Sequence, residues 1–369
     1  MKKFLIACYR IGCWVVMPVY ILCALSSYLS PSVCFFTDAL ALAFPFLLLA
    51  LLVVIITALF CNRRLAVIAS LVLLSGFTNI SRTIAFHPFA PKTVARNGNT
   101  LKVLTWNVFF FLNDHELKND TIGNKRREMI NLIKESDADV LCFQEYLSYF
   151  NVKGLVSVHH ILDSLGYKYS IFSNDHIYHY NGGTSHIGAI LYSRLPISDS
   201  GRIAFHNTQE EHAVYADITV NKQKVRVFAA HLSSLGLYND TTNTSENVYE
   251  LSYKRKGSIA RKIKRTALQH EMEAHMLDSA FSHSPQPVIY CADMNSAPTS
   301  YTYATIRGNL QDAFLVKGFG LGQTYDALSP TLRIDVCFAS KQLTVEHCEV
   351  KRAHLSDHFP VITTFAVTK

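Results

Sequence analysis

The sequence predicts an α/β or α+β sandwich that follows an N-terminal region of transmembrane helices. Three observations support this fold class. Residues 1–84 are dominated by long uncharged apolar stretches, residues 100–369 alternate short apolar strands with amphipathic helices, and polar side chains recur at the ends of those strands. Strands and helices mixed in this way pack as layers around a core, and 369 residues can bury a sizeable one.

The N-terminal region contains three uncharged stretches, at residues 11–37, 39–62 and 65–81. A helix needs about 20 apolar residues to cross a bilayer, so the first two stretches are long enough and the third is shorter. We therefore predict about three transmembrane helices within residues 1–84. The alternative, a cleaved signal peptide at the first stretch, is disfavoured because no clean small-x-small cleavage site precedes the second stretch.

Charged residues in the loops predict the orientation of these helices. Residues 1–85 hold one acid, Asp38, and six basic residues, so most of the net charge of +7 belongs to the membrane flanks and does not indicate a nucleic-acid partner. Basic loops stay in the cytoplasm, so three spans place everything after residue 84 at the extracytoplasmic (periplasmic or extracellular) face. Without the third span the orientation inverts. The basic residues precede the first stretch (Lys2, Lys3, Arg10), separate the second from the third (Arg63, Arg64) or follow the third (Arg82).

Residues 85–99 contain two prolines and little periodicity, so we predict a linker there, followed by a catalytic domain over residues 100–369. Two segments of this domain, residues 124–137 and 258–281, have helical patterns. The first has an apolar face of Met129, Ile130 and Ile133, and the second one of Ile259, Ile263, Ala267 and Met276. Strands are predicted at residues 101–109, 138–146, 168–173, 187–194, 225–232, 287–294, 333–340 and 360–367.

Polar side chains stand at the ends of several predicted strands. Each has an ordinary structural explanation: His231 as a structural histidine, Glu145 as an acid at a helix N-terminus, Asn295 as a turn residue. The ordered set outweighs these explanations, because strand ends gather on one rim of a sheet, where sites are usually built. The set comprises Asn107, Gln144, Glu145, His231, Asp293, Asn295, Asp335, Asp357 and His358.

These residues lie in motifs that resemble a known family. TWNV, DVLCFQE, GAILYSRLPI, AAHLSS, CADMNSAP, RIDVCFAS and LSDHFPV resemble, in order, the signature blocks of the endonuclease/exonuclease/phosphatase superfamily. That superfamily includes deoxyribonucleases, abasic-site endonucleases and neutral sphingomyelinases. The resemblance runs from about residue 101 to the end of the sequence. It implies a four-layered αββα sandwich with two mixed sheets and an Mg²⁺-dependent hydrolase that acts on phosphate ester bonds.

The resemblance also implies roles for the residues. Asn107, Glu145 and Asp357 would hold Mg²⁺ or Mn²⁺, which favour hard oxygen ligands. Asp357 would orient the ring of His358, and His358 or Asp293 would take a proton from the attacking water. His231 and Asn295 would donate hydrogen bonds to the phosphate, and Asp335 would be a further carboxylate beside the metal. Cleaving a phosphate ester requires all of these functions.

Two features of the catalytic domain stay open at this level. The segment YNGGTSHI departs from the family pattern, and Tyr180, Ser185 or His186 could face the phosphate there. Four cysteines lie outside the N-terminal region, and we interpret them as buried free thiols, with a disulfide as the alternative. These cysteines are Cys142, Cys291, Cys337 and Cys348.

A cluster of basic residues lies at and just before the start of the second predicted helix. It is either a solvated helix face or a contact with anionic lipid. A track for nucleic-acid phosphates is disfavoured, because no aromatic residues are interleaved with the charges. The seven residues of this basic cluster are Lys254, Arg255, Lys256, Arg261, Lys262, Lys264 and Arg265.

Together these features predict a membrane-anchored, metal-dependent phosphoesterase whose partners are the lipid bilayer and a phosphate-ester substrate, either a phospholipid or a nucleic acid. An extracytoplasmic nuclease acting on DNA or RNA is the alternative within the same chemistry. A catalytically inactive membrane-tethered binding module is a third possibility. It is disfavoured because every polar position that the chemistry needs is filled, whereas a decayed site would show gaps.

Overall fold

Two mixed β-sheets lie face to face in the computed structural model, which describes residues 2–91, 94–111, 120–150, 158–180, 183–205, 212–234, 259–327 and 329–367. The first sheet has the strand order β14-β15-β2-β3-β6-β4, with β5 paired to β6, and the second has the order β11-β13-β10-β9-β8-β7. The pairs β2–β3 and β9–β10 are parallel and the other pairs are antiparallel, so both sheets are mixed as predicted.

All eight predicted strands are present. They are β2 (Thr100–Asn107), β3 (Val140–Phe150), β4 (Tyr169–Phe172), β6 (Gly183–Ser193), β9 (Gln223–His231), β10 (Val288–Asp293), β13 (Asp335–Ala339) and β15 (Val361–Ala366).

Several strands were not predicted, and their sequences explain why. The strands β7 and β14 lie at the edges of their sheets and carry polar, partly exposed residues in place of an apolar run. In β8, the strand next to the edge strand β7, the apolar run is interrupted by Asp217, which is buried and pairs with Arg226 at 2.6 Å. These strands are β5 (His176–Tyr180), β7 (Ile197–Ala204), β8 (His212–Val220) and β14 (Thr344–Val350), with the two-residue strands β1 (Ala85–Phe86), β11 (Gln311–Asp312) and β12 (Phe319–Gly320).

Helices cover the outer faces of both sheets and complete the four layers that the family resemblance implies. Helices α5 (Asp120–Ser136) and α6 (Val158–Ser164) pack on the first sheet. Helices α8 (Ile259–Ser282) and α9 (Tyr301–Arg307) pack on the second. Short helical segments, η1 (Phe109–Phe111) and α10 (Ala313–Lys317), follow β2 and β11.

The space between the sheets is filled by short and branched apolar side chains from both of them. Cys142, Cys291, Cys337 and Cys348 are buried and unpaired, which confirms the prediction of free thiols. Of the predicted face of α5, Met129 and Ile133 are fully buried. The predicted face of α8 is partly wrong, because Ile259 is exposed while His270 and Glu273 are buried.

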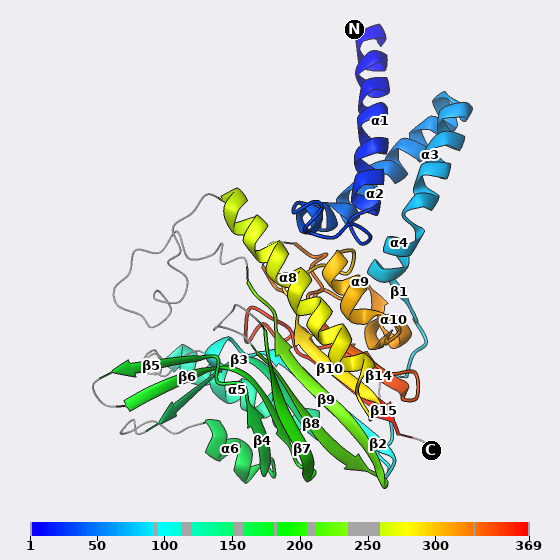
Figure 1. Cartoon of the computed structure of the whole chain (residues 1–369). Helices are drawn as coiled ribbons and strands as arrows, with labels where there is room; N and C mark the ends of the chain where they lie inside the picture. Colours follow the sequence, from blue (N-terminus) through cyan, green and yellow to red (C-terminus); the bar gives the residue numbers. More distant parts are fainter. Residues whose placement is uncertain are drawn as a thin grey trace.

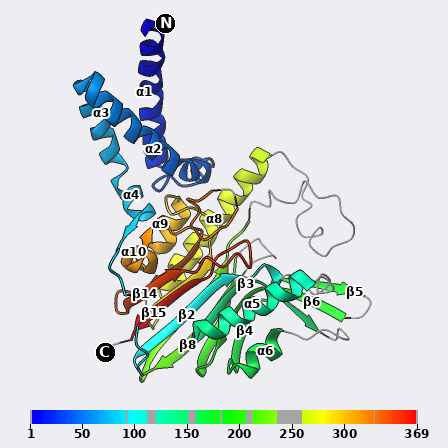
Figure 2. The same ribbon diagram turned by 180° about the vertical axis from the view of Figure 1, so that it is seen from behind.

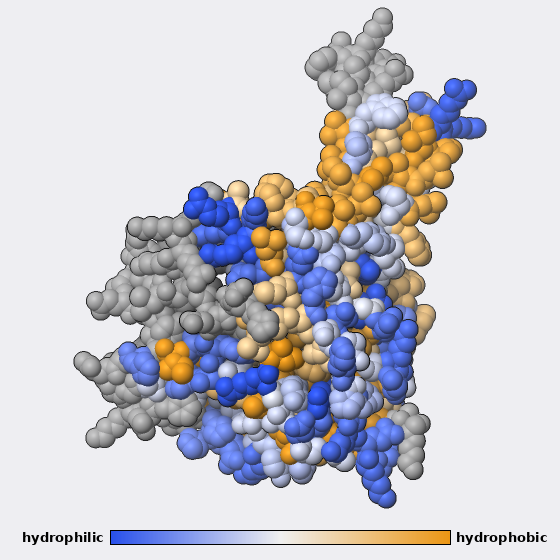
Figure 3. All heavy atoms as spheres, in the orientation of Figure 1, coloured by the Kyte–Doolittle hydropathy of each residue, from blue (hydrophilic) through white to orange (hydrophobic). Residues whose placement is uncertain are grey.

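The N-terminal region forms four helices: α1 (Lys2–Ala24), α2 (Thr37–Cys61), α3 (Arg63–Ser75) and α4 (Phe77–Thr83). Among the described residues, α2 is the one helix that is long and apolar enough to cross a membrane alone. Many of its large apolar side chains are exposed, including Leu49, Ile56 and Phe60, and Figure 3 shows the apolar surface of this region.

The third predicted span is a bent helix pair in the structure. Helices α3 and α4 meet at 63° across Gly76, as a broken span or a re-entrant segment would. The hydroxyl of Tyr20 in α1 donates to the carbonyl oxygen of Leu73 at 3.1 Å, and a Cβ at Gly76 would lie 2.0 Å from that hydroxyl. Close packing of α1 against the bend therefore requires a glycine at this position.

The predicted linker, residues 85–99, is fastened to the catalytic domain instead of hanging free. Strand β1 pairs with β12, and the backbone N–H of His87 donates to the carbonyl oxygen of Gly318 at 3.1 Å. Further along, Arg96 pairs with Asp137 and Asp139. These contacts fasten the segment that follows the N-terminal helices to the sandwich, and the helices project from one end of it (Figures 1 and 2).

Candidate active site

The register of the second sheet brings three of the predicted site residues side by side. His231 at the end of β9 pairs with Asp293 at the end of β10, and Asp293 pairs with Asp335 at the start of β13. Because β9 and β10 are parallel and β13 is antiparallel to them, the end of one strand and the start of another reach the same rim. Residues far apart in the sequence are thus neighbours.

The first sheet contributes Asn107 and Glu145 from the facing rim. Asn107 ends β2 beside Gln144 in β3, and the register of β3 is then interrupted between Phe143 and Tyr146. Glu145 lies in this irregularity with a φ of 50°. A β-bulge of this kind redirects a side chain, here toward the second sheet.

The amide of Asn107 joins the two rims. Its Nδ2 atom donates to Oε1 of Glu145 at 3.1 Å and to Oδ2 of Asp293 at 3.0 Å. Its Oδ1 atom accepts from the backbone N–H of Phe109 at 3.1 Å and keeps a second lone pair. Asn107 therefore presents nitrogen to the carboxylates in this structure, while its oxygen can still accept one further partner.

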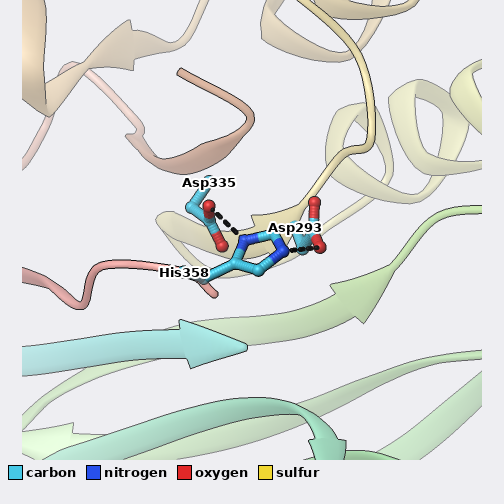
Figure 4. Close-up of side chains that lie close together, drawn as sticks. All are labelled: Asp293, Asp335 and His358. Atoms are coloured by element: carbon cyan, nitrogen blue, oxygen red, sulfur yellow. Dashed lines mark hydrogen bonds and ion pairs between the residues drawn. The ribbon is translucent and has the colours of Figure 1, made fainter. Parts of the chain in front are cut away.

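His358 stands between two carboxylates (Figure 4). Its Nδ1 atom lies 2.8 Å from Oδ2 of Asp335 and its Nε2 atom lies 3.6 Å from Oδ2 of Asp293. Asp335, and not the adjacent Asp357 as predicted, therefore orients the imidazole ring. Neighbours in sequence at the start of an extended segment point apart, which explains why Asp357 does not reach the ring nitrogen of His358.

Asn295 and His231 form the other side of the site. The backbone N–H of Asn295, whose φ is 47°, donates to Oδ1 of Asp293 at 2.9 Å. The Asn295 amide donates to the carbonyl oxygen of Leu232 at 2.9 Å and lies 3.1 Å from Nε2 of His231. The same Nε2 atom is 3.6 Å from Oδ2 of Asp293 and 4.0 Å from Oε1 of Glu145.

Burial perturbs the ionisation of these groups. Burial raises the pKa of Glu145; His231 opposes this shift and Asp357 adds to it. Burial also raises the pKa of Asp335, to about 6, although His358 opposes it. Burial alone would lower the pKa of His358, but Asp335 and Asp293 outweigh it and raise that pKa to about 10. The site thus concentrates negative charge at low solvent exposure.

Asp293, Asp335 and His358 offer ligand atoms that all lie within 4.8 Å of one another, but both ring nitrogens of His358 face carboxylate oxygens, so this cluster is not the proposed cation site. The donors that fit a divalent cation are the carboxylates of Glu145 and Asp357 and the amide oxygen of Asn107, which keeps a second lone pair. Asp357 lies close enough to Glu145 to raise the pKa of its carboxyl group. Crowded carboxylates that disfavour one another's charge are stabilised when a cation binds among them.

The structure adds two residues that the sequence did not single out. The hydroxyl of Thr324 accepts from the backbone N–H groups of Ile334 and Asp335, both at 3.0 Å. The ring of Tyr325 lies 4.9 Å from that of His358. Both residues lie in a loop that reaches the site by pairing with the segment before β15. A loop has no apolar periodicity, so no local pattern of the sequence marks either residue.

Two of the three candidates for the residue that faces the phosphate in YNGGTSHI, Ser185 and His186, have described side chains. His186 lies 3.2 Å from Oγ1 of Thr184 and also contacts Asn174, and Ser185 is buried. The side chain of Tyr180 lies outside the described residues, as do Lys254, Arg255 and Lys256 of the basic cluster.

Comparison with known proteins agrees with this geometry. A model of the endonuclease/exonuclease/phosphatase family matches residues 104–358. The chain belongs to this family. Its members are hydrolases that act on phosphate esters. A second model, a domain of unknown function (DUF8431), matches residues 2–83, and no curated protein matches the chain.

Solved structures share the fold at low sequence identity. The human Nocturnin catalytic domain, with bound sulfate, is 18% identical with a TM-score of 0.52 over 74% of this chain and 96% of its own. A family protein from Leptotrichia buccalis is 17% identical with a TM-score of 0.50 over 72% and 99%. One from Beutenbergia cavernae is 18% identical with a TM-score of 0.49 over 73% and 72%.

Proposed function

We propose that this chain is a membrane-anchored, divalent-metal-dependent phosphoesterase that hydrolyses its substrate by in-line attack of water. The observation that carries the proposal is the convergence of Glu145, Asp293 and His358 from three distant parts of the sequence on one rim of the sandwich. Asn107 bridges two of these carboxylates. Hydrolysis of a phosphate ester needs this combination of hard oxygen ligands, a proton acceptor and hydrogen-bond donors.

The side chains divide the work as follows. His358 donates from Nδ1 to Asp335 and its Nε2 atom lies 3.6 Å from Oδ2 of Asp293, so it orients Asp293, and Asp293 accepts the proton of the attacking water. Of the two candidate bases, His358 and Asp293, this geometry favours Asp293. His231 and Asn295 donate hydrogen bonds to the phosphate oxygens as charge develops on them.

Glu145, Asp357 and the amide oxygen of Asn107 would hold the metal ion, Mg²⁺ or Mn²⁺. When bound, it would neutralise charge on the phosphate. The chain's own contribution is to bring Glu145 to the amide of Asn107, through the bulge in β3 and the hydrogen bond between the two side chains. Ser356, the neighbour of Asp357, donates to the carbonyl oxygen of Asn107 at 2.8 Å.

Two surfaces of the chain, one apolar and one basic, favour a substrate at the membrane surface. Helix α2 exposes a large apolar surface, and its N-terminal end contacts the catalytic domain. Arg261, Lys264 and Arg265 lie on the first two turns of α8, where Figure 3 shows a hydrophilic patch beside the apolar N-terminal helices. Basic residues near a bilayer attract anionic lipid by about 1 kcal/mol each. We therefore favour a phospholipid or another phosphate ester near the membrane.

Activity on bis-p-nitrophenyl phosphate tests the chemistry. The full chain in detergent should hydrolyse it with Mg²⁺ and lose this activity with EDTA, and His358→Ala should lower kcat by about 10²-fold or more. An exposed histidine away from the site, His283→Ala, serves as the matched control. A His358→Ala variant as active as the parent would remove the proposed mechanism, and an inactive but folded parent would favour the binding-module alternative.

The substrate class needs a second comparison. The full chain is incubated with plasmid DNA, with RNA and with mixed phospholipid vesicles, each with Mg²⁺. Release of headgroup phosphate or phosphoalcohol from the vesicles supports the lipid proposal. Cleavage of nucleic acid with intact vesicles would replace it with the extracytoplasmic nuclease.

A further inference from the structure

Asp38 is the only acidic residue among residues 1–84 of the sequence, and it lies in the first turn of α2. An acid there is favourable for the helix dipole alone. Its contact, however, reaches across to the catalytic domain: Oδ2 of Asp38 lies 3.3 Å from Nδ1 of His270 in α8. The His270 side chain is only 1% exposed, so this contact is shielded from solvent.

His270 also contacts the loop that follows β9. Its Nε2 atom lies 2.7 Å from the carbonyl oxygen of Ser233. A carbonyl oxygen and a carboxylate oxygen can only accept, so both ring nitrogens of His270 donate. One turn further along α8, Glu273 accepts from the hydroxyl of Ser233 at 2.6 Å and from its backbone N–H at 3.3 Å. Side chains of α8 thus bind three polar groups of Ser233: its carbonyl oxygen, its hydroxyl and its backbone N–H.

Ser233 lies two residues after His231 in the same segment. The intervening Leu232 donates its N–H to the carbonyl oxygen of Asp293 at 3.0 Å and accepts from the Asn295 amide at 2.9 Å. That amide is 3.1 Å from Nε2 of His231. The segment that α8 fixes therefore contains His231 and binds the amide of Asn295. These are the two residues proposed to donate hydrogen bonds to the phosphate.

We propose that Asp38, His270 and Glu273 are positioning residues through which helix α2 fixes the segment bearing His231. The catalytic consequence of this link rests on the proposed function, whereas the structural link does not. Misplacing a catalytic group by about 1 Å can lower a rate by about 10²-fold. Separating α2 from α8 is therefore expected to lower turnover without removing any group that touches substrate.

The test compares Asp38→Asn and His270→Gln with Glu271→Gln in the full chain in lipid nanodiscs. Glu271 is the matched control, because it neighbours His270 and accepts from the N–H of Ser32, in the loop before α2, at 2.9 Å. Unlike His270 and Glu273, it is not one of the residues that bind Ser233. We expect Asp38→Asn and His270→Gln to lower kcat about tenfold with KM within about twofold, and their effects to be non-additive in the double variant.

Hydrogen exchange gives a readout that does not require activity. The amides of residues 232–234 should exchange faster in Asp38→Asn and His270→Gln and at the parental rate in Glu271→Gln. If the parent hydrolyses no phosphate ester, the proposed function fails and exchange alone decides the link. If His270→Gln does not fold, Asp38→Asn decides. Unchanged exchange in a folded Asp38→Asn, or an equal effect of Glu271→Gln, would overturn the inference.

Discussion

At the scale of single residues, unusual backbone conformations place the reactive groups. Glu145 and Asn295 both have positive φ, at 50° and 47°, which L-residues other than glycine seldom adopt. Such strain persists where the surrounding structure compensates for it, and it clusters at functional sites. At Asn295 the backbone N–H bonds to Asp293, and at Glu145 the bulge turns the carboxylate toward Asn107.

Replacing Asp335 or Asp357 should separate their roles. Asp335→Asn keeps the shape of the side chain but removes the charge beside Nδ1 of His358, so kcat should fall by about 10²-fold or more at saturating Mg²⁺. Asp357→Asn should instead raise the Mg²⁺ concentration needed for half-maximal activity, because Asp357 is a proposed metal ligand. Steady-state kinetics over a Mg²⁺ titration distinguishes the two, and equal behaviour would contradict this assignment.

His270 should make stability depend on pH. Burial alone would lower the pKa of His270, but Asp38 and Glu273 outweigh it and raise the pKa from 6.5 to about 9. Because the folded pKa exceeds the unfolded one, this stabilisation is complete below pH 6.5 and is lost as pH rises through 9. The shift corresponds to about 3 kcal/mol. Unfolding in detergent across this range should show the decline for the parent and a shallower one for His270→Gln. Parallel curves would contradict it.

The residues of the site could be predicted from the sequence better than their contacts. Asn107, His231 and Asp293 stand at the ends of apolar runs, so their gathering on one rim follows from strand geometry. The partner of His358 depends on the register of β13 against β10, which no local pattern encodes. The contacts of His270 could not be predicted either, because its titratable side chain interrupts the face of α8 that was expected to be apolar.

At the scale of secondary-structure elements, predictability follows burial. Strands buried on both faces, such as β10, form continuous apolar runs that the sequence reveals. The edge strand β7 has five exposed residues out of eight and no buried one, so it lacks that signal. The bend between α3 and α4 was also missed, because it packs against the side chain of Tyr20, which is distant from Gly76 along the chain.

Gly76→Ala should therefore destabilise the N-terminal helices. The new Cβ would lie 2.0 Å from the hydroxyl oxygen and 2.7 Å from the ring carbon Cζ of Tyr20. Overpacking of this kind costs about 1–3 kcal/mol. Gly98→Ala is the matched control, since nothing lies within 4 Å of a Cβ at that position. Thermal unfolding in detergent should show a lower Tm for Gly76→Ala alone, and equal Tm values would exclude the steric explanation.

At the scale of the whole molecule, the ends of α2 differ in charge. The exposed residues Arg63 and Arg64 follow its C-terminal end, while its N-terminal end carries Asp38 and contacts the catalytic domain. Helix α1 packs beside α2 and begins at the end away from the sandwich (Figures 1 and 2). Positive charge is thus concentrated on the side of the helical region opposite the site.

This asymmetry predicts an extracytoplasmic catalytic domain, because basic loops stay in the cytoplasm. A reporter enzyme that folds only outside the cytoplasm, fused after residue 369, should be active, and a reporter that fluoresces only inside should be dark. Replacing Arg63 and Arg64 with glutamate should lower the fraction in this orientation, whereas the same change at Lys351 and Arg352, in the catalytic domain, should not. The reverse reporter pattern would place the site in the cytoplasm and restrict its substrates to those of the inner membrane face.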